Sequence, residues 1–238
     1  MRVAAIDDEP EIFYTLQGEG PSLGKPALFL RLSGCNLNCI WCDTPYTWNW
    51  EDTNNAHSEK FVREQQQISI EPKEVAELLN QYVPTVMLVI SGGEPLTQQS
   101  AIAELLEHCN VERVEIETNG TRAPIEALKD CHFNVSIKLS NSNVAYNKRI
   151  KPNAIEAFLA IENVMFKFVI DSQEDLDEVE FIQSEFNIPN SLISLMPQGR
   201  SAEEINSKLE WLSEICMRKQ YTLTTRLHVL TWGNKRAV

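Results

Sequence analysis

The stretch PALFLRLSGCNLNCIWC, residues 26–42, places an apolar run directly before a loop that carries three cysteines. The run PALFLRL (26–32) is almost continuously apolar, as is typical of a parallel strand buried on both faces. Gly34 then opens a loop in which Cys35, Cys39 and Cys42 follow the spacing C-x-x-x-C-x-x-C. In α/β barrels, loops at the carboxyl ends of the strands are where chemistry is assembled. The cysteine loop is therefore the first candidate site.

The rest of the chain alternates between short apolar runs and helical patterns. Strands are expected at 86–90, 111–117, 133–139, 164–170, 192–196 and 227–230, and helices at 72–82, 99–109, 123–131, 173–186 and 201–219. Ser201, followed by Glu204, is a capping-box signature for the last helix. This alternation predicts right-handed βαβ units and mainly parallel strands. Six or so strands are too few for a closed eight-stranded barrel, so we expect an α/β fold with a partial, open TIM-like barrel.

Unusual residue clusters follow five of the expected strands. They read SGCNLNCIWC, SGGEP, TNG, SNSN and PQGR, in chain order. Because the carboxyl ends of parallel strands meet at one rim, we expect these clusters to form a single active site.

Composition restricts the classes of function. The 238 residues include 34 acidic and 21 basic side chains, giving a net charge of −13. This acidity argues against binding to nucleic acid phosphates and to anionic lipid, but not against a small anionic ligand. No apolar stretch approaches the roughly 20 residues that span a bilayer, and the N-terminus turns acidic too early for a signal peptide. We expect a cytoplasmic protein with one domain, 1–238, and an exposed polar insertion around 49–67, whose conformation (loop or short helix) stays open.

The six cysteines divide into two groups. Cys109, Cys131 and Cys216 are scattered and are interpreted as small core residues. The other three are too few to saturate a 4Fe–4S cluster, so one iron would keep an open position. A zinc site that borrows a distant cysteine, or a simple electron-transfer cluster, are the alternatives.

The cysteine motif, together with GGEP (92–95), resembles the signatures of the radical S-adenosylmethionine (radical SAM) enzymes. This resemblance implies that the open iron chelates the amino and carboxylate groups of S-adenosylmethionine. Reductive cleavage of the cofactor then gives methionine and a 5′-deoxyadenosyl radical that abstracts a substrate hydrogen.

Within that superfamily the chain resembles the 7-carboxy-7-deazaguanine synthase family over nearly its whole length. The matching blocks are EIFYTLQGEG (11–20), FLRLSGCNLNCIWCDT (29–44), ISGGEP (90–95), ETNG (117–120) and RLHVLTWGNKRAV (226–238). The resemblance implies conversion of 6-carboxy-5,6,7,8-tetrahydropterin to 7-carboxy-7-deazaguanine with loss of ammonia and help from Mg²⁺. It also implies a homodimer and an external flavodoxin- or ferredoxin-type electron donor.

Several residues are candidates for substrate binding. The segment Leu16, Gln17, Gly18 and Glu19 offers an amide, a carboxylate and accessible backbone to a pterin edge, although it also fits a plain polar turn. Arg31, in an otherwise apolar strand, could hold the substrate carboxylate or simply lie exposed. The resemblance adds Ser91, and more weakly His228 and the carboxylate of Val238. It also makes Thr44 the Mg²⁺ ligand, a hard oxygen of the kind that ion accepts.

For S-adenosylmethionine, the family pattern points to two groups of residues. The first comprises Trp41, Cys42, Asp43 and Gly93. The second comprises Gln198 and a segment that reads Ser-Pro-Lys in the family. In this chain the segment is Ser136-Ile137-Lys138. The isoleucine in place of proline is a departure that could change the local backbone. Lys138 could instead be a surface lysine whose stem lies along apolar surface.

Two other functions remain compatible with the cysteine spacing. A glycyl-radical-enzyme activase shares the motif but needs neither Arg31 nor the LQGEG segment (16–20). A ferredoxin-like carrier or zinc-stabilised binding module would not cleave S-adenosylmethionine. Incubation with the tetrahydropterin would separate the synthase from the activase, and a test for cleavage of S-adenosylmethionine would separate both from the carrier or module.

Overall fold

The structure is a computed structural model that describes residues 1–53, 55, 57–82 and 87–238. Within these residues an eleven-stranded sheet has the order β11-β10-β9-β8-β7-β6-β4-β1-β2, with β3 paired to β4 and β5 to β1. The strands from β4 through β6, β7, β8, β9 and β10 to β11 pair in parallel. The strands are β1 (Arg2–Ile6), β2 (Glu9–Pro10), β3 (Ile12–Leu16), β4 (Pro26–Leu32), β5 (Gln67–Ser69), β6 (Met87–Gly92), β7 (Arg113–Thr118), β8 (His132–Val135), β9 (Val164–Ile170), β10 (Ile193–Pro197) and β11 (Thr222–Leu223).

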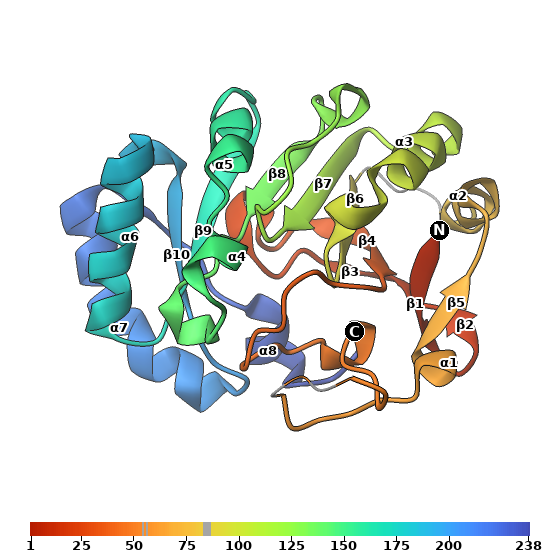
Figure 1. Ribbon diagram of the computed structural model, residues 1–238, viewed down its shortest axis with the longest axis horizontal. Coiled ribbons are helices and arrows are strands. Elements are labelled where there is room, and N and C mark those ends of the chain that lie inside the picture. Colours follow the sequence, from red (N-terminus) through yellow and green to blue (C-terminus); the bar gives the residue numbers. More distant parts are fainter. Residues whose placement is uncertain (54, 56, 83–86) are drawn as a thin grey trace.

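Helices cover the outside of this curved sheet. Figure 1 shows α2, α3, α5, α6 and α7 in an arc along the outer side, with the cysteine loop and the C-terminal residues on the inner side. The predicted partial, open barrel of mainly parallel strands is confirmed. The helices are α1 (Arg63–Gln66), α2 (Pro72–Leu79), α3 (Gln99–His108), α4 (Tyr146–Arg149), α5 (Pro152–Leu159), α6 (Gln173–Phe186), α7 (Ala202–Lys219) and α8 (Leu227–Trp232).

The buried parallel strands were the most predictable elements. β4 and β9 begin and end at the predicted residues, and β6, β7 and β10 differ by one or two positions, apart from residue 86, which lies outside the described residues. The capping box of α7 is also present, because the Ser201 hydroxyl accepts from the Glu204 amide at 3.2 Å.

Three predicted elements are wrong in kind or extent. Residues 227–230 form the start of helix α8 instead of a strand, since the amides of Val229 and Leu230 donate to the Arg226 carbonyl. A run of four mostly apolar residues, LHVL, fits a buried strand and a short buried helix equally well. β8 ends at Val135, so residues 136–139 follow the strand, and the helix expected at 123–131 is only a 3-10 turn, Glu126–Leu128.

The sequence pattern missed the antiparallel edge of the sheet. β3 pairs with β4 in antiparallel register, Ile12 opposite Leu30 and Leu16 opposite Pro26. β1 pairs antiparallel with β2, β4 and β5. These short strands lack the long apolar run that marks the central ones, and β3 has no fully buried residue.

The polar segment 49–67 is folded onto the protein, although residues 54 and 56 lie outside the described part. Asn49, Trp50 and His57 are buried, so the expectation of an exposed insertion is wrong for them. The Asn49 amide donates to the His57 carbonyl at 3.2 Å, and the segment ends in α1. Polar side chains that satisfy backbone groups inside a folded loop explain why the composition misled.

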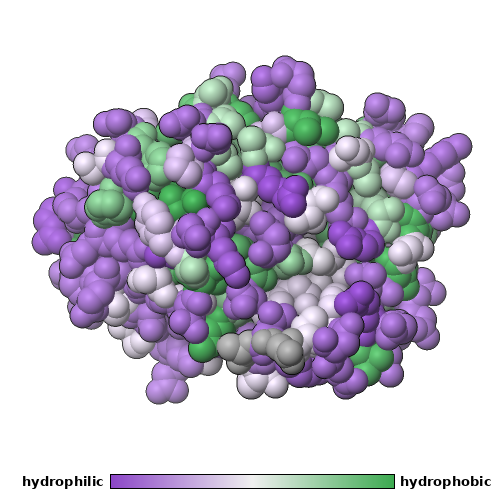
Figure 2. Space-filling view, viewed as in Figure 1, coloured by the Kyte–Doolittle hydropathy of each residue, from purple (hydrophilic) through white to green (hydrophobic). Residues whose placement is uncertain are grey.

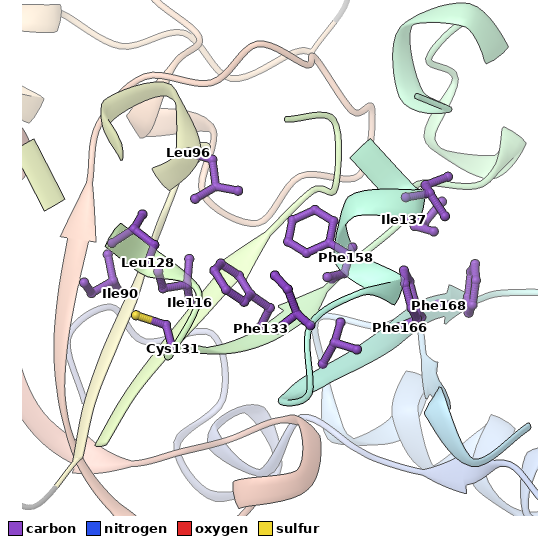
Figure 3. Close-up of a cluster of buried hydrophobic side chains, with 14 of the residues drawn as sticks. Ile90, Leu96, Ile116, Leu128, Cys131, Phe133, Ile137, Phe158, Phe166 and Phe168 are labelled. Carbon is purple, nitrogen blue, oxygen red and sulfur yellow. The ribbon is translucent and has the colours of Figure 1, made fainter. Parts of the chain in front are cut away.

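The hydrophobic core fills the space between the sheet and the outer helices. Figure 3 shows Phe133 of β8 beside Phe158 of α5, and their ring centroids lie 5.3 Å apart. Both rings are almost fully buried, and such burial contributes about 1.5–3 kcal/mol per side chain. Cys131 and Cys216 are buried here and Cys109 packs partly buried against the cluster, as predicted.

Hydrophilic side chains cover most of the face shown in Figure 2. Among the described residues, none of the helices combines the length and the apolar character that a membrane crossing requires.

Candidate active site

A cavity of about 490 Å³ lies where the loops after the parallel strands meet the cysteine loop. Its wall includes every site residue predicted from the sequence except Ile137. The Ile137 side chain is instead buried in the hydrophobic core, so only its backbone is left to serve a ligand. Four of the five predicted rim clusters reach this cavity. The fourth, SNSN (140–143), lies behind the cysteine loop, where the Ile40 amide donates to the Ser142 carbonyl at 3.0 Å.

Local packing holds the three cysteine side chains together. Cys35, Cys39 and Cys42 pack in one cluster with Leu37 and Val144. Burial raises the pKa of the Cys39 thiol to about 11 and also raises that of the other two. Thiols in this setting ionise when a metal takes the place of the proton.

N–H groups already point at two of the sulfur atoms. The Leu37 amide donates to Cys35 Sγ at 3.4 Å, and the Trp48 indole donates to Cys42 Sγ at 3.2 Å. Iron–sulfur clusters are held by thiolates whose sulfurs accept such hydrogen bonds. Cys131 and Cys216 lie buried in the core, away from this cavity, so the local donor set fits a three-cysteine cluster with one iron left open.

The GGEP turn packs directly against the cysteine loop. A Cβ on Gly93 would lie 2.2 Å from the Gly34 carbonyl oxygen, and one on Gly92 would lie 2.0 Å from the Leu32 carbonyl oxygen. Gly92 also has a φ of +141°. Only glycine allows this approach of the β6 end to the loop.

Glu94 fastens the same turn to the next strand. Its buried carboxylate accepts from the Thr118 hydroxyl at 2.7 Å and from the amides of Asn119 and Leu96 at 2.6 and 2.9 Å. The Asn119 side chain then donates to Asn36 inside the cysteine loop at 2.9 Å. Glu94 therefore helps to fix the position of the cysteine loop. Its carboxylate is occupied by these hydrogen bonds and is not free to bind a ligand.

On the opposite wall, Arg31 is held by a buried carboxylate. Its Nε donates to Glu11 Oε1 at 3.1 Å, and its Nη1 lies 3.5 Å from the Ser91 hydroxyl. The Glu11 side chain is fully buried and that of Arg31 is 17% exposed. Arg31 thus faces the cavity, and the carboxylate of Glu11 compensates part of its positive charge. The alternative of a surface arginine is wrong.

A second charged network surrounds Glu19. Lys167 Nζ contacts Glu19 Oε2 at 2.5 Å and Glu117 Oε2 at 2.7 Å. Arg226 bridges Glu19 to Asp43. Burial alone would raise the pKa of Glu19, but the charges of Lys167 and Arg226 outweigh it and hold the pKa far below its usual range. Burial raises the pKa of Glu117.

Gln17 and Gly18 complete this wall. The Gln17 amide donates to Glu115 and to Glu117 at 3.2 Å each. A Cβ on Gly18 would lie 2.2 Å from His228 Nδ1, so helix α8 packs against this turn. Burial lowers the pKa of His228, which leaves its ring neutral at neutral pH.

The predicted S-adenosylmethionine residues lie near the cysteines. Lys138 Nζ sits 5.6 Å from the Trp41 ring centroid and donates to the Ser136 hydroxyl at 2.8 Å. The Trp41 indole donates to Asn141 at 3.1 Å. Lys138 therefore faces the cavity, which disfavours its interpretation as a surface lysine.

Comparison with known proteins agrees with this arrangement. The model of the radical SAM superfamily matches residues 30–165. The 7-carboxy-7-deazaguanine synthase of Pyrobaculum aerophilum is 37% identical, with 95% of each chain covered. The chain belongs to the 7-carboxy-7-deazaguanine synthase family of the radical SAM superfamily. The synthase of Hyperthermus butylicus is 30% identical over 92% of this chain and 90% of its own.

A solved structure supports the same family assignment. The crystal structure of QueE from Escherichia coli aligns with a TM-score of 0.68 and 25% sequence identity, covering 91% of this chain and 92% of that one. This radical SAM enzyme therefore uses a 4Fe–4S cluster and S-adenosylmethionine, and the activase, electron-carrier and zinc-module alternatives are not favoured.

The synthase cavity also contains charged residues that sequence reasoning missed. Among them are Glu117, Lys167, Arg226 and Arg236, with Glu11 directly behind the wall. Lys167 had a usable signal, because a lysine inside the apolar run VMFKFVI (164–170) needs an anionic partner, as was argued for Arg31. The others are ordinary charged residues in sequence and become informative only through their partners in space.

Proposed function

We propose that this chain converts 6-carboxy-5,6,7,8-tetrahydropterin to 7-carboxy-7-deazaguanine with release of ammonia. The observation that carries the proposal is that one cavity joins the three cluster cysteines to the half-buried Arg31 and a polar turn, Gln17 to Glu19. An anionic, flat, hydrogen-bonding substrate fits that combination in a protein whose net charge is −13.

The cysteines Cys35, Cys39 and Cys42 would hold the 4Fe–4S cluster. With S-adenosylmethionine bound, this cluster supplies the radical that abstracts a hydrogen atom from the substrate. The cofactor would be held by the predicted S-adenosylmethionine residues, and the protein would exclude water from it. These residues are Trp41, Asp43, Gly93, Ser136, Ile137 (through its backbone), Lys138 and Gln198.

The substrate would lie between Arg31 and the LQGE turn. Arg31, with Ser91 beside it, would bind the substrate carboxylate, since guanidinium and carboxylate pair with directional, charge-assisted hydrogen bonds. Leu16 to Glu19 would bind the pterin edge. His228 and Val238 lie at the same wall and would contact the substrate there.

Thr44 would contribute one oxygen to Mg²⁺, with substrate oxygens and water as the remaining ligands. The Asp43 carboxylate is paired with Arg226, so this ion would depend on the hydroxyl of Thr44. We further propose a single cytoplasmic catalytic domain that works as a homodimer, without nucleic acid or membrane, and takes electrons from a flavodoxin- or ferredoxin-type donor.

The test is anaerobic reconstitution with iron and sulfide, followed by dithionite, S-adenosylmethionine, Mg²⁺ and the tetrahydropterin. We expect mass spectrometry to show the deazaguanine carboxylate in the wild-type reaction. The Cys39→Ala protein is the matched control and should give none. Cleavage of S-adenosylmethionine by the wild type without any deazaguanine would contradict the substrate assignment.

A further inference from the structure

Glu11 holds two arginines with a single buried carboxylate. Its Oε1 accepts from Arg31 Nε at 3.1 Å and from the Tyr46 hydroxyl at 3.2 Å. Its Oε2 accepts from Nε and Nη2 of Arg236 at 3.0 and 2.7 Å. Each oxygen therefore serves a different arginine, and the Glu11 side chain is fully buried.

The remaining surfaces of the Arg236 guanidinium are also occupied. Nη1 donates to Gln66 at 2.8 Å and Nη2 to the Ala5 carbonyl at 2.6 Å. The guanidinium carbon lies 3.6 Å from the centroid of the Tyr46 ring, which adds a cation–π contact. Figure 1 shows the C-terminal residues beside the orange segment that contains Tyr46. Arg236 is thus held in one position by hydrogen bonds from all three guanidinium nitrogens and by the Tyr46 ring.

With Arg236 held in this way, residues 233–238 lie along the wall of the active-site cavity, and we call this the seated position of the segment. The Thr15 hydroxyl of β3 adds a second attachment by donating to the Val238 carbonyl at 2.7 Å. Arg236 and Val238 are therefore two points at which this segment is attached, to Glu11 and to Thr15 respectively.

The charges of the cluster do not cancel. One carboxylate, that of Glu11, faces two guanidinium groups. Asp43, the other carboxylate that acts on Arg31, is itself paired with Arg226. A positive charge is therefore left within the Glu11 cluster, where Arg31 meets the cavity. An anionic ligand at Arg31 would complete the balance. Because Glu11 is shared with Arg236, Arg31 keeps more of its charge available for that ligand than it would in an exclusive pair.

We propose that Glu11 and Arg236 are positioning residues that couple the binding of the substrate carboxylate to the seating of residues 233–238. This inference rests on the proposed function, since it takes Arg31 as the site of the substrate carboxylate. The coupling is reciprocal: a seated Arg236 strengthens carboxylate binding, and a bound carboxylate stabilises the seated segment.

The test uses the cluster-loaded protein with S-adenosylmethionine and no reductant, so that nothing turns over. Titration calorimetry compares 6-carboxypterin with pterin, which lacks the carboxylate. In Arg236→Gln we expect 6-carboxypterin to bind roughly 10-fold more weakly, within the usual range of coupling, while the affinity for pterin falls much less. Arg236→Lys, which keeps the charge but lacks the forked geometry, should fall between the two. Arg218→Gln, at an exposed position of α7, is the matched control.

Hydrogen exchange provides a readout that a purely structural role would not change. In the wild type, 6-carboxypterin should slow amide exchange in residues 233–238, and in Arg236→Gln this protection should vanish. Equal weakening of both ligands in the variant, or unchanged affinity for both, would overturn the coupling. Failure of the wild type to prefer 6-carboxypterin over pterin would instead overturn the assignment of Arg31 to the substrate.

Discussion

Gly93 and Gly34 approach so closely that a Cβ on Gly93 would lie 2.2 Å from the Gly34 carbonyl oxygen. The Glu94 amide donates to that same carbonyl at 2.8 Å, so the end of β6 and the start of the cysteine loop form one unit. The GGEP turn therefore fixes the backbone that carries the cysteines, in addition to any contact it makes with a ligand.

Gly93→Ala should displace the cysteine loop. We expect a loss of about 1–3 kcal/mol in unfolding free energy, as overpacking usually costs, together with lower iron content after reconstitution. Chemical denaturation and iron analysis measure the two effects. Gly24→Asn is the control, because a Cβ at Gly24 meets open space and asparagine tolerates its φ of +81°. Full iron content in Gly93→Ala would refute the packing argument.

Arg31→Ala should weaken substrate binding while leaving the cluster intact. Loss of a charge-assisted hydrogen bond costs about 1.5–3 kcal/mol, which corresponds to roughly a 10- to 100-fold drop in kcat/KM. Glu11 would keep Arg236 as its partner, so the fold should survive. Kinetics and the visible absorbance of the cluster measure the two outcomes, with exposed Arg122→Ala as the control. Loss of the cluster in Arg31→Ala would show that our division of roles is wrong.

Lys167→Met should destabilise the protein strongly. The lysine compensates Glu19 and Glu117, and removing one partner of a buried ion pair costs about 3–5 kcal/mol. Lys129→Met breaks only the exposed pair with Glu126 and should cost less than about 1 kcal/mol. Denaturation curves of the two variants at pH 7 test the difference, and equal losses would contradict it.

The same variant should acquire a new pH dependence. Burial already raises the pKa of Glu117, and removing the ammonium of Lys167 would raise it further. A carboxyl whose pKa is higher in the folded than in the unfolded state makes stability fall as the pH rises between those two values. We therefore expect Lys167→Met to be more stable at pH 5 than at pH 7.5, measured by thermal unfolding relative to wild type. The opposite trend would mean that Glu117 stays ionised without its partner.

Trp48→Phe should make the cluster harder to reduce. The indole N–H donates to Cys42 Sγ at 3.2 Å, and hydrogen bonds to the sulfurs help to set the potential of such clusters. Without this donor the extra negative charge of the reduced state is less stabilised, so the midpoint potential should become more negative. A potentiometric titration followed by electron paramagnetic resonance measures it. The control is Trp50→Phe, because the Trp50 ring lies under Arg63 and its replacement should leave the midpoint potential unchanged. An unchanged potential in Trp48→Phe would contradict the role of the hydrogen bond.

The fold was predictable where one local signal dominated. β4 and β9 are seven-residue runs, apolar apart from one charged residue each, and they match their predictions at both ends. The run LHVL (227–230) failed because its length does not distinguish a strand from a helix, and its conformation is decided by packing, with the Leu227 amide donating to the Gly18 carbonyl at 2.9 Å. The antiparallel edge was missed because pairing between distant short strands leaves no periodicity in either one.

The site was predictable from its motifs, but the network behind it was not. The cysteine spacing and the arginine in an apolar strand both lie within a single short stretch of chain. Glu11 and Arg236 are separated by 225 positions, and Lys167 and Glu19 by 148. No local pattern links such pairs, and apart from Lys167, which lies inside an apolar run, each residue alone looks like an ordinary surface charge.

We propose that Cys35, Cys39 and Cys42 hold the cluster and leave one iron free for S-adenosylmethionine. The most direct measurement is the electron paramagnetic resonance spectrum of the reduced, anaerobically purified protein before and after S-adenosylmethionine is added. Because the cofactor would bind the free iron, we predict a clear change in the spectrum. A spectrum that S-adenosylmethionine leaves unaltered would show that no iron of the cluster is free to bind it.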